Sequence, residues 1–91
     1  MADKKAYFYV LKCLDGTFYA GYTVDLTRRL AEHNQGIGAK YTRPKMRRPL
    51  KMIHSETFAT KSEAMQAEAA FKKLSRKQKE QYLRTKSVEP Q

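Results

Sequence analysis

Hydrophobic and polar positions follow two different periods along the chain, and these periods mark the expected elements. Residues 6–14 and 17–22 are rich in aromatic and β-branched side chains, which is typical of β-strands. The Asp15-Gly16 pair between them is typical of a tight hairpin turn. Residues 50–58 predict a third strand. Large side chains alternate onto both faces of the hairpin, so we expect helices to cover both faces of the sheet.

Helical patterns follow the hairpin and the third strand. Residues 25–34 carry apolar side chains at helical spacing, and Gly36 is a typical residue just past a helix end. The sequences TKSE at 60–63 and SRKQ at 75–78 are capping boxes, which predict helices reaching about residues 74 and 83. Residues 35–49 contain glycines and prolines and predict an irregular loop.

Length and composition then set the class of protein. The 91 residues, 41% of them hydrophobic, fit a single domain, with a core at about 6–83 and a frayed tail at 84–91. The element order β-β-α-β-α-α predicts an α+β fold, a three-stranded antiparallel sheet flanked by helices. No apolar run approaches the ~18 residues of a membrane span and no signal sequence is apparent, so we expect a cytoplasmic protein with no membrane partner. One cysteine and two histidines exclude an internal disulfide and a zinc site.

Charge is the strongest signal of a partner. Nineteen Lys and Arg against nine Asp and Glu give a net charge of +10, which favours polyanions. Two other interpretations of this charge remain open. It only keeps the protein soluble, or the chain is a ribosome-associated basic domain. Between His33 and Ser55 the chain has no acid, which favours a phosphate-facing surface over a solvated loop. The cations of this stretch are Lys40, Arg43, Lys45, Arg47, Arg48 and Lys51.

Helix geometry singles out one arginine and one glutamate. At ~100° per residue from Leu26, Arg29 falls near 300°, on the flank of the apolar face, whereas Arg28 falls near 200° and points to water. Glu68 lies on the edge of the apolar stripe of the second long helix, so its carboxylate needs a partner. That partner is either a Lys or Arg in a structural salt bridge or a divalent metal ion, and geometry alone leaves both open.

Tyrosines crowd the predicted hairpin. Tyr9 and Tyr19 lie at similar distances from the Asp15-Gly16 turn, so pairing of the strands would bring them near each other. Tyrosines are common in strands, so the crowding alone does not indicate function. A phenol is a legitimate proton acceptor if nearby cations lower its pKa from ~10.

Four features occur in a fixed order: the tripeptide YFY at 7–9, the tripeptide YAG at 19–21, Arg29, and Glu68 on a later helix. Together they resemble the GIY-YIG nuclease superfamily. The closest resemblance is to its small stand-alone bacterial members, which are similar to the N-terminal domain of the excinuclease C subunit of nucleotide-excision repair. The resemblance covers residues 7–83, nearly the whole chain.

The resemblance implies a role for each of five residues. Tyr9 would take a proton from the attacking water, with Tyr19 and His33 orienting it. Arg29 would neutralise charge growing on the phosphoryl oxygens. Glu68 would bind Mg²⁺ or Mn²⁺. The lack of other acids near these residues favours one metal ion over two.

The expected function follows from the resemblance and the charge together. We expect a metal-dependent endonuclease that hydrolyses DNA phosphodiester bonds in DNA repair or recombination, with Gly21 letting backbone approach the substrate closely. The sequence leaves open whether the DNA is branched, nicked or single-stranded. Two alternatives remain: a catalytically weak or inactive nucleic-acid-binding module of the same fold, and a non-catalytic ribosome- or RNA-associated basic protein.

Overall fold

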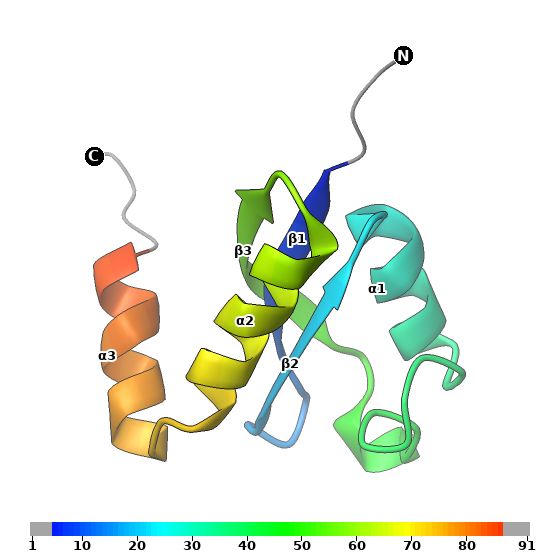
Figure 1. The fold of residues 1–91 in the computed structure, drawn as a ribbon. Coiled ribbons are helices and arrows are strands. Elements are labelled where there is room, and N and C mark those ends of the chain that lie inside the picture. The colour runs from blue at the N-terminus through cyan, green and yellow to red at the C-terminus, as the bar shows by residue number, and fades with distance from the viewer. Residues whose placement is uncertain (1–4, 87–91) are drawn as a thin grey trace, which may run out of the picture.

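The computed structural model describes residues 5–86 as three strands and three helices, with one short 3₁₀ segment in the loop before the third strand (Figure 1). Their order, β-β-α-β-α-α, and the α+β class confirm the prediction. The elements are β1 (Ala6–Lys12), β2 (Phe18–Thr23), α1 (Leu26–Asn34), η1 (Lys45–Arg47), β3 (Lys51–Phe58), α2 (Lys61–Lys72) and α3 (Arg76–Lys86).

The sheet has the strand order β2-β1-β3, and both pairings are antiparallel. Tyr9 pairs with Gly21 and Leu11 pairs with Tyr19. Directly opposed residues of an antiparallel pair point to the same face, so Tyr9 and Tyr19 share a face of the hairpin. Because β2 is an edge strand, side chains from helices on either face can meet beside it.

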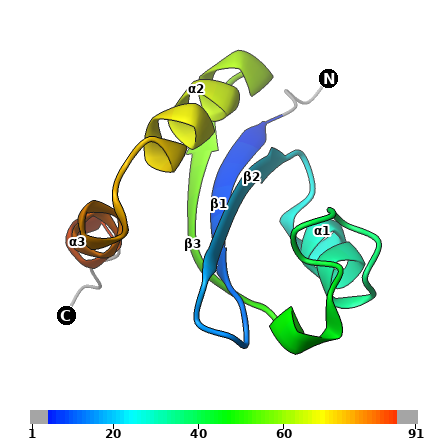
Figure 2. The same cartoon turned by 90° about the horizontal axis from the view of Figure 1, so that it is seen from below.

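Helices cover both faces of the sheet, as the two-sided apolar pattern predicts. Helix α1 and the loop that follows it lie against one face, and α2 and α3 lie against the other (Figures 1 and 2). The two faces carry separate cores. One core contains Phe8, Val10, Ala20, Phe71 and Leu83. The other contains Tyr9, Leu11, Cys13 and Leu50.

Side chains cap the helix starts, at the two predicted capping boxes and also at Asp25 before α1. The side chains of Asp25 and Thr60 each accept a hydrogen bond from the backbone N–H three residues on, at 3.0 and 3.2 Å, which satisfies free N–H groups at the starts of α1 and α2. Ser75 and Gln78 exchange two such bonds and complete the second capping box. Gly36 follows α1 with a φ of +84°, a conformation that glycine adopts at little cost.

Several element boundaries differ from the prediction by one to three residues, among them the ends of α3 and β1. Helix α3 continues to Lys86, so residues 84–86, expected in the frayed tail, are helical. Buried Leu83 attaches this turn to the core, and the Thr85 hydroxyl donates to the Gln81 carbonyl at 2.9 Å. The rest of the predicted tail lies outside the described residues. Strand β1 ends at Lys12 rather than residue 14, because Cys13 begins the turn. No helix within residues 5–86 has the length and apolar character needed to cross a membrane.

Candidate active site

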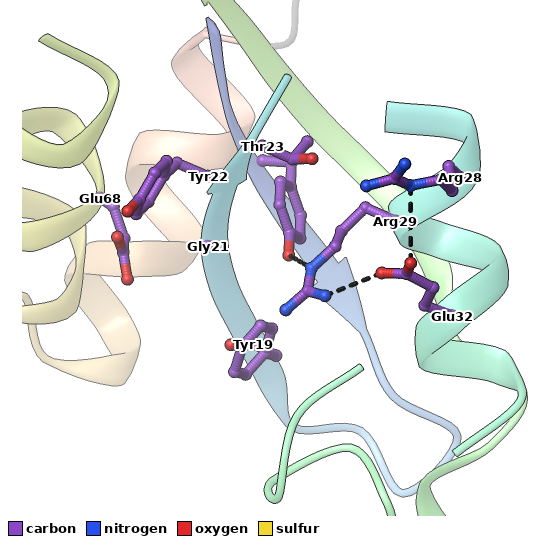
Figure 3. Close-up of a pocket in the computed structure, with 9 residues that line it drawn as sticks. Tyr19, Gly21, Tyr22, Thr23, Arg28, Arg29, Glu32 and Glu68 are labelled. Carbon is purple, nitrogen blue, oxygen red and sulfur yellow. Dashed lines mark hydrogen bonds and ion pairs between the residues drawn. The ribbon is translucent and has the colours of Figure 1, made fainter. Parts of the chain in front are cut away.

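A pocket of about 320 Å³ lies along β2 and draws on both faces of the sheet. Figure 3 shows Arg28, Arg29 and Glu32 approaching it from α1 on one side of β2, and Glu68 from α2 on the other. The edge position of β2 therefore brings together residues that are far apart in the sequence. The lining residues are Tyr9, Tyr19, Gly21, Tyr22, Thr23, Arg28, Arg29, Glu32 and Glu68.

Arg29 is held in one orientation by three hydrogen bonds. It donates from Nη1 to Glu32 Oε1 at 2.9 Å, from Nη2 to the Gly38 carbonyl at 2.8 Å, and from Nε to the Tyr9 hydroxyl at 3.4 Å. Its side chain is 30% exposed, whereas that of Arg28 is 71% exposed. The helix-phase prediction that these neighbouring arginines differ is confirmed.

A directed chain of hydrogen bonds runs from the pocket into the core. The Thr42 hydroxyl donates to the Ala39 carbonyl at 3.3 Å, so its oxygen accepts from His33 Nδ1–H at 2.7 Å. His33 Nε2 is then a bare acceptor, and it receives the Tyr9 O–H at 2.9 Å. His33 and Thr42 are fully buried, and the hydrogen bond to Tyr9 connects His33 to the pocket.

Burial decides the protonation states of Tyr9 and His33. Burial raises the pKa of Tyr9 to about 12, although the hydrogen bond from Arg29 opposes the shift. Burial, helped by the charge of Arg29, lowers the pKa of His33 to about 4. Both side chains are therefore neutral at pH 7. A phenol is expected to act as a proton acceptor if nearby cations lower its pKa. The free protein does not meet this condition, because burial raises the Tyr9 pKa by more than Arg29 lowers it.

Gly21 is buried and faces the core rather than open solvent. A Cβ at this position would lie 2.6 Å from the Tyr9 hydroxyl oxygen and 3.3 Å from a ring carbon of Tyr19. The missing side chain therefore makes room for Tyr9. Tyr19 packs beside it, with its ring centroid 5.0 Å from that of His33 and 6.0 Å from the stacked ring of Tyr41.

Glu68 lies across β2 from Arg29, with its side chain 16% exposed. Its Oε2 is 2.6 Å from Lys72 Nζ, and the Lys72 side chain is 52% exposed. An exposed (i, i+4) pair contributes only about 0.3–0.5 kcal/mol. Here Lys72 is half exposed but Glu68 is mostly buried, so the pair supplies the Lys partner of the salt-bridge alternative and leaves the metal alternative open.

The donor set around Glu68 fits a hard divalent cation. Mg²⁺ keeps several waters and takes one or two carboxylates plus substrate phosphates, and the Glu68 carboxylate faces such a pocket. Within residues 5–86 no three His, Cys, Asp or Glu side chains gather to form an all-protein cage. A cation with one protein ligand matches what these residues offer.

Glu32 is a second acid in the pocket, contrary to the expectation that the candidate site residues have no other acid near them. Its carboxylate forms ion pairs with Arg29 at 2.9 Å and with Arg28 at 3.5 Å. Both carboxylate oxygens of Glu32 are therefore already paired with arginines. The signal in the sequence is its spacing, three and four residues after the arginines. Thr42 has no such signal, because only the path of the loop brings it to His33.

The predicted basic stretch divides into two groups. Arg47 pairs with Asp15 at 3.1 Å and donates to the Tyr41 carbonyl at 2.9 Å, which ties the loop to the hairpin. The Arg48 guanidinium packs over Gly36, where a Cβ would meet it at 3.0 Å. These two arginines are partly buried and stabilise the loop. The other four cations are exposed: Lys40, Arg43, Lys45 and Lys51.

The fold and the pocket define a class of protein. Residues 5–81 match the family described as the GIY-YIG catalytic domain. The chain belongs to this family, which confirms the resemblance drawn from the two tyrosine tripeptides, the helix arginine and the late glutamate. Membership supports a nuclease-type function acting on DNA.

The relatives within the family carry the name UPF0213 protein. One from Enterococcus faecalis is 67% identical over 86 residues, covering 93% of this chain and 98% of the relative. Another from Listeria welshimeri is 66% identical over 77 residues, covering 85% and 83%. A solution NMR structure of an E. faecalis protein has 65% identity and a TM-score of 0.65, covering 97% and 92%. That of the Bacillus halodurans UPF0213 protein has 45% identity and a TM-score of 0.59, covering 90% and 85%.

Proposed function

We propose that this chain is a metal-dependent endonuclease that hydrolyses DNA phosphodiester bonds and serves DNA repair or recombination. The observation that carries the proposal is the meeting of Tyr9, Arg29 and Glu68 in one pocket from three separate elements. A phosphate placed there would have a fixed cation on one side of β2 and a carboxylate on the other. Membership of the GIY-YIG family supports the same assignment.

Glu68 is the residue that would bind a single Mg²⁺ or Mn²⁺ ion. When bound, the cation supplies charge neutralisation at the scissile phosphate and at the leaving oxygen. Lys72 would have to leave Glu68 Oε2 first, and its half-exposed side chain can turn toward a neighbouring phosphate at little cost.

Arg29 provides the fixed positive charge. Its bonds to Glu32, Gly38 and Tyr9 set its position before substrate arrives, so little reorganisation is needed as charge grows on the phosphoryl oxygens. Arg28 lines the same pocket but is mostly exposed, and its contribution is limited to attracting the phosphate.

Tyr9 accepts a proton without first becoming a phenolate. The attacking water gives its proton to Tyr9 Oη while Tyr9 gives its own proton to His33 Nε2. The imidazole keeps its Nδ1–H bond to Thr42 throughout, which fixes the ring and the tautomer. The transfer avoids a free phenolate at a Tyr9 pKa of about 12, and it requires that the negative charge of a bound phosphate raise the His33 pKa from about 4 so that the imidazole can hold the proton.

Binding of DNA away from the pocket depends on charge. We infer that the exposed cations of the loop and β3 contact the DNA backbone, because within residues 5–86 none of them forms an ion pair and no base-reading element is apparent. This predicts sequence-independent, salt-dependent binding. The residues concerned are Lys40, Arg43, Lys45 and Lys51.

The test is nicking of supercoiled plasmid by wild type, Arg29→Ala and Arg28→Ala in Mg²⁺ or Mn²⁺. We expect Arg29→Ala to reduce the nicking rate at least 100-fold while binding DNA almost normally, because Arg29 stabilises the charge that develops in the transition state rather than the bound DNA. Arg28→Ala, the matched loss of one charge, should retain most activity. Equal effects would contradict the proposed role of Arg29. Salt-dependent binding with no nicking by wild type would instead indicate an inactive DNA-binding module of this fold.

A further inference from the structure

A second group of basic side chains lies on the opposite face of the sheet from the basic loop. Residues 72–86 carry seven Lys or Arg and one acid, Glu80, which is already paired with Arg76 at 2.8 Å. Apart from Lys72, which pairs with Glu68, this charge takes no part in the site described above. Four of the cations gather around the turn between α2 and α3, and we call them the α2–α3 basic surface: Lys72, Lys73, Arg76 and Lys77.

The α2–α3 basic surface begins at the pocket. Lys72 lies one helical turn after Glu68 and pairs with it at 2.6 Å. The Lys72 ammonium is also 6.0 Å from the ring centroid of Tyr19, another residue of the pocket. Positive charge therefore continues from the edge of the pocket toward the start of α3.

The end of the hairpin joins this surface to the basic loop. Arg76 donates from Nη1 to the Gly16 carbonyl at 2.9 Å, and its guanidinium lies 4.0 Å from the ring centroid of Phe18. On the other side, Arg47 pairs with the adjacent Asp15 at 3.1 Å. Figures 1 and 2 show the α2–α3 turn and the loop containing η1 on either side of the hairpin end. The two basic regions thus flank the same end of β2.

The charge on this surface is available to a ligand. Lys73 and Lys77 are exposed, and within residues 5–86 neither side chain makes a hydrogen bond or ion pair. The apolar side of α3 is already used, because Leu83 is buried and Tyr82 packs against the core. Between Arg76 and Lys86 the large apolar side chains Tyr82 and Leu83 already pack on the core, which disfavours insertion of this helix into a lipid surface. A nucleic acid, whose phosphates repeat along a line, fits this arrangement better.

We propose that the α2–α3 basic surface is a second DNA-binding surface, continuous with the pocket. It contacts backbone phosphates on the α2 side of β2 while the loop cations contact phosphates on the α1 side, so that the DNA passes over the edge of the sheet at the pocket. The proposal rests on the proposed function in taking DNA as the ligand, but it assigns binding to residues outside the basic loop.

The experiment compares two double variants that lose the same charge. Lys73→Gln with Lys77→Gln removes two exposed cations of the surface. The control variant, Lys5→Gln with Lys61→Gln, also removes two exposed cations. One lies just before β1 and the other is the first residue of α2, at the end of that helix away from the α2–α3 turn. Binding of a fluorescent 20-base-pair duplex is measured from 50 to 300 mM salt, and nicking of plasmid is measured in parallel. Each variant is checked for an unchanged thermal melt.

We expect the Lys73/Lys77 variant to reduce the slope of log K against log salt by up to ~1.8, at ~0.9 per lost phosphate contact, and so to weaken binding at 0.1 M salt by roughly eightfold per lost contact, up to ~60-fold for two. The Lys5/Lys61 variant should differ little from wild type. Equal effects of the two variants, with wild-type nicking intact, would overturn the second surface while leaving the proposed function standing. Absence of DNA binding by wild type would overturn the function itself. Binding to anionic vesicles that depends on Lys73 and Lys77, with DNA binding unaffected, would assign the surface to lipid and overturn the proposal.

Discussion

Gly21→Ala tests whether the absence of a side chain at position 21 is what allows the Tyr9 phenol to pack against β2. The added Cβ would lie 2.6 Å from the Tyr9 hydroxyl oxygen, about 0.8 Å short of the 3.4 Å at which ordinary contact begins. Tyr9 is 1% exposed, and its hydroxyl lies 2.9 Å from His33 Nε2. The phenol therefore cannot move away without disturbing either the core or its hydrogen bond to His33.

The expected cost of the clash is about 1–3 kcal/mol, the usual range for one methyl group too many in a packed core. In a domain of this size the melting temperature should fall by about 4–8 °C for each kcal/mol. Nicking should fall further than the folded fraction explains, roughly 100-fold, because a displacement near 1 Å at a reacting group has that effect. Thermal melts and plasmid nicking on the same preparations measure both quantities.

A double-mutant cycle with Tyr9→Phe identifies the clash. Phenylalanine removes the atom at 2.6 Å and leaves the ring carbon at 2.9 Å, so Gly21→Ala should cost less stability in that background. Neither Tyr9→Phe nor the double variant should nick DNA. Gly16→Ala is the control glycine, because its φ of +88° makes it costly while no atom lies within 4 Å of the added Cβ. Stability effects of Gly21→Ala and Tyr9→Phe that add within about 0.5 kcal/mol would show that the added methyl group does not clash with the Tyr9 hydroxyl.

Three further predictions concern stability, each measured by thermal or urea unfolding. Arg47→Ala should lower the melting temperature clearly more than Lys45→Ala, because only Arg47 ties the loop to the hairpin, and equal melts would contradict that role. Below pH 6.5 the unfolded chain protonates His33 but the folded chain does not until about pH 4, so wild type should lose up to ~3 kcal/mol over that window. His33→Gln should lack this loss, and parallel pH profiles would disprove the assignment. Glu68→Ala should change stability by less than about 1 kcal/mol because Lys72 is half exposed, and a loss above 3 kcal/mol would make Glu68 structural.

The parts of the site that sequence could predict are those fixed by local geometry. The helical period separates Arg29 from Arg28, and it places Glu68 at the border of an apolar stripe. The hairpin turn between Tyr9 and Tyr19 brings both tyrosines onto one face of paired strands. Capping boxes likewise predict the starts of two helices, because each cap is satisfied within four residues.

The remaining features depend on how distant segments meet. The loop folds back on the hairpin, and this contact, rather than charge, decides that Arg47 stabilises the loop while Lys45 stays exposed. The same loop brings Thr42 to His33 and so fixes the tautomer that accepts the Tyr9 proton. The Tyr9 pKa likewise results from a balance between burial and a nearby cation, and the burial is known only once the core has formed.

The proposed function requires Glu68 for metal-dependent cleavage of DNA at this pocket, and a metal titration of plasmid nicking measures that requirement. Nicking of supercoiled plasmid is followed across a Mg²⁺ and Mn²⁺ titration for wild type and Glu68→Gln, with DNA binding measured on the same preparations. Glutamine keeps the shape of the side chain but lacks the anionic oxygen that Mg²⁺ prefers. We predict that wild type nicks only with metal, and that Glu68→Gln binds DNA as well or more tightly yet does not nick at any metal concentration. Nicking by Glu68→Gln at the wild-type rate, or metal-independent nicking by wild type, would contradict the account.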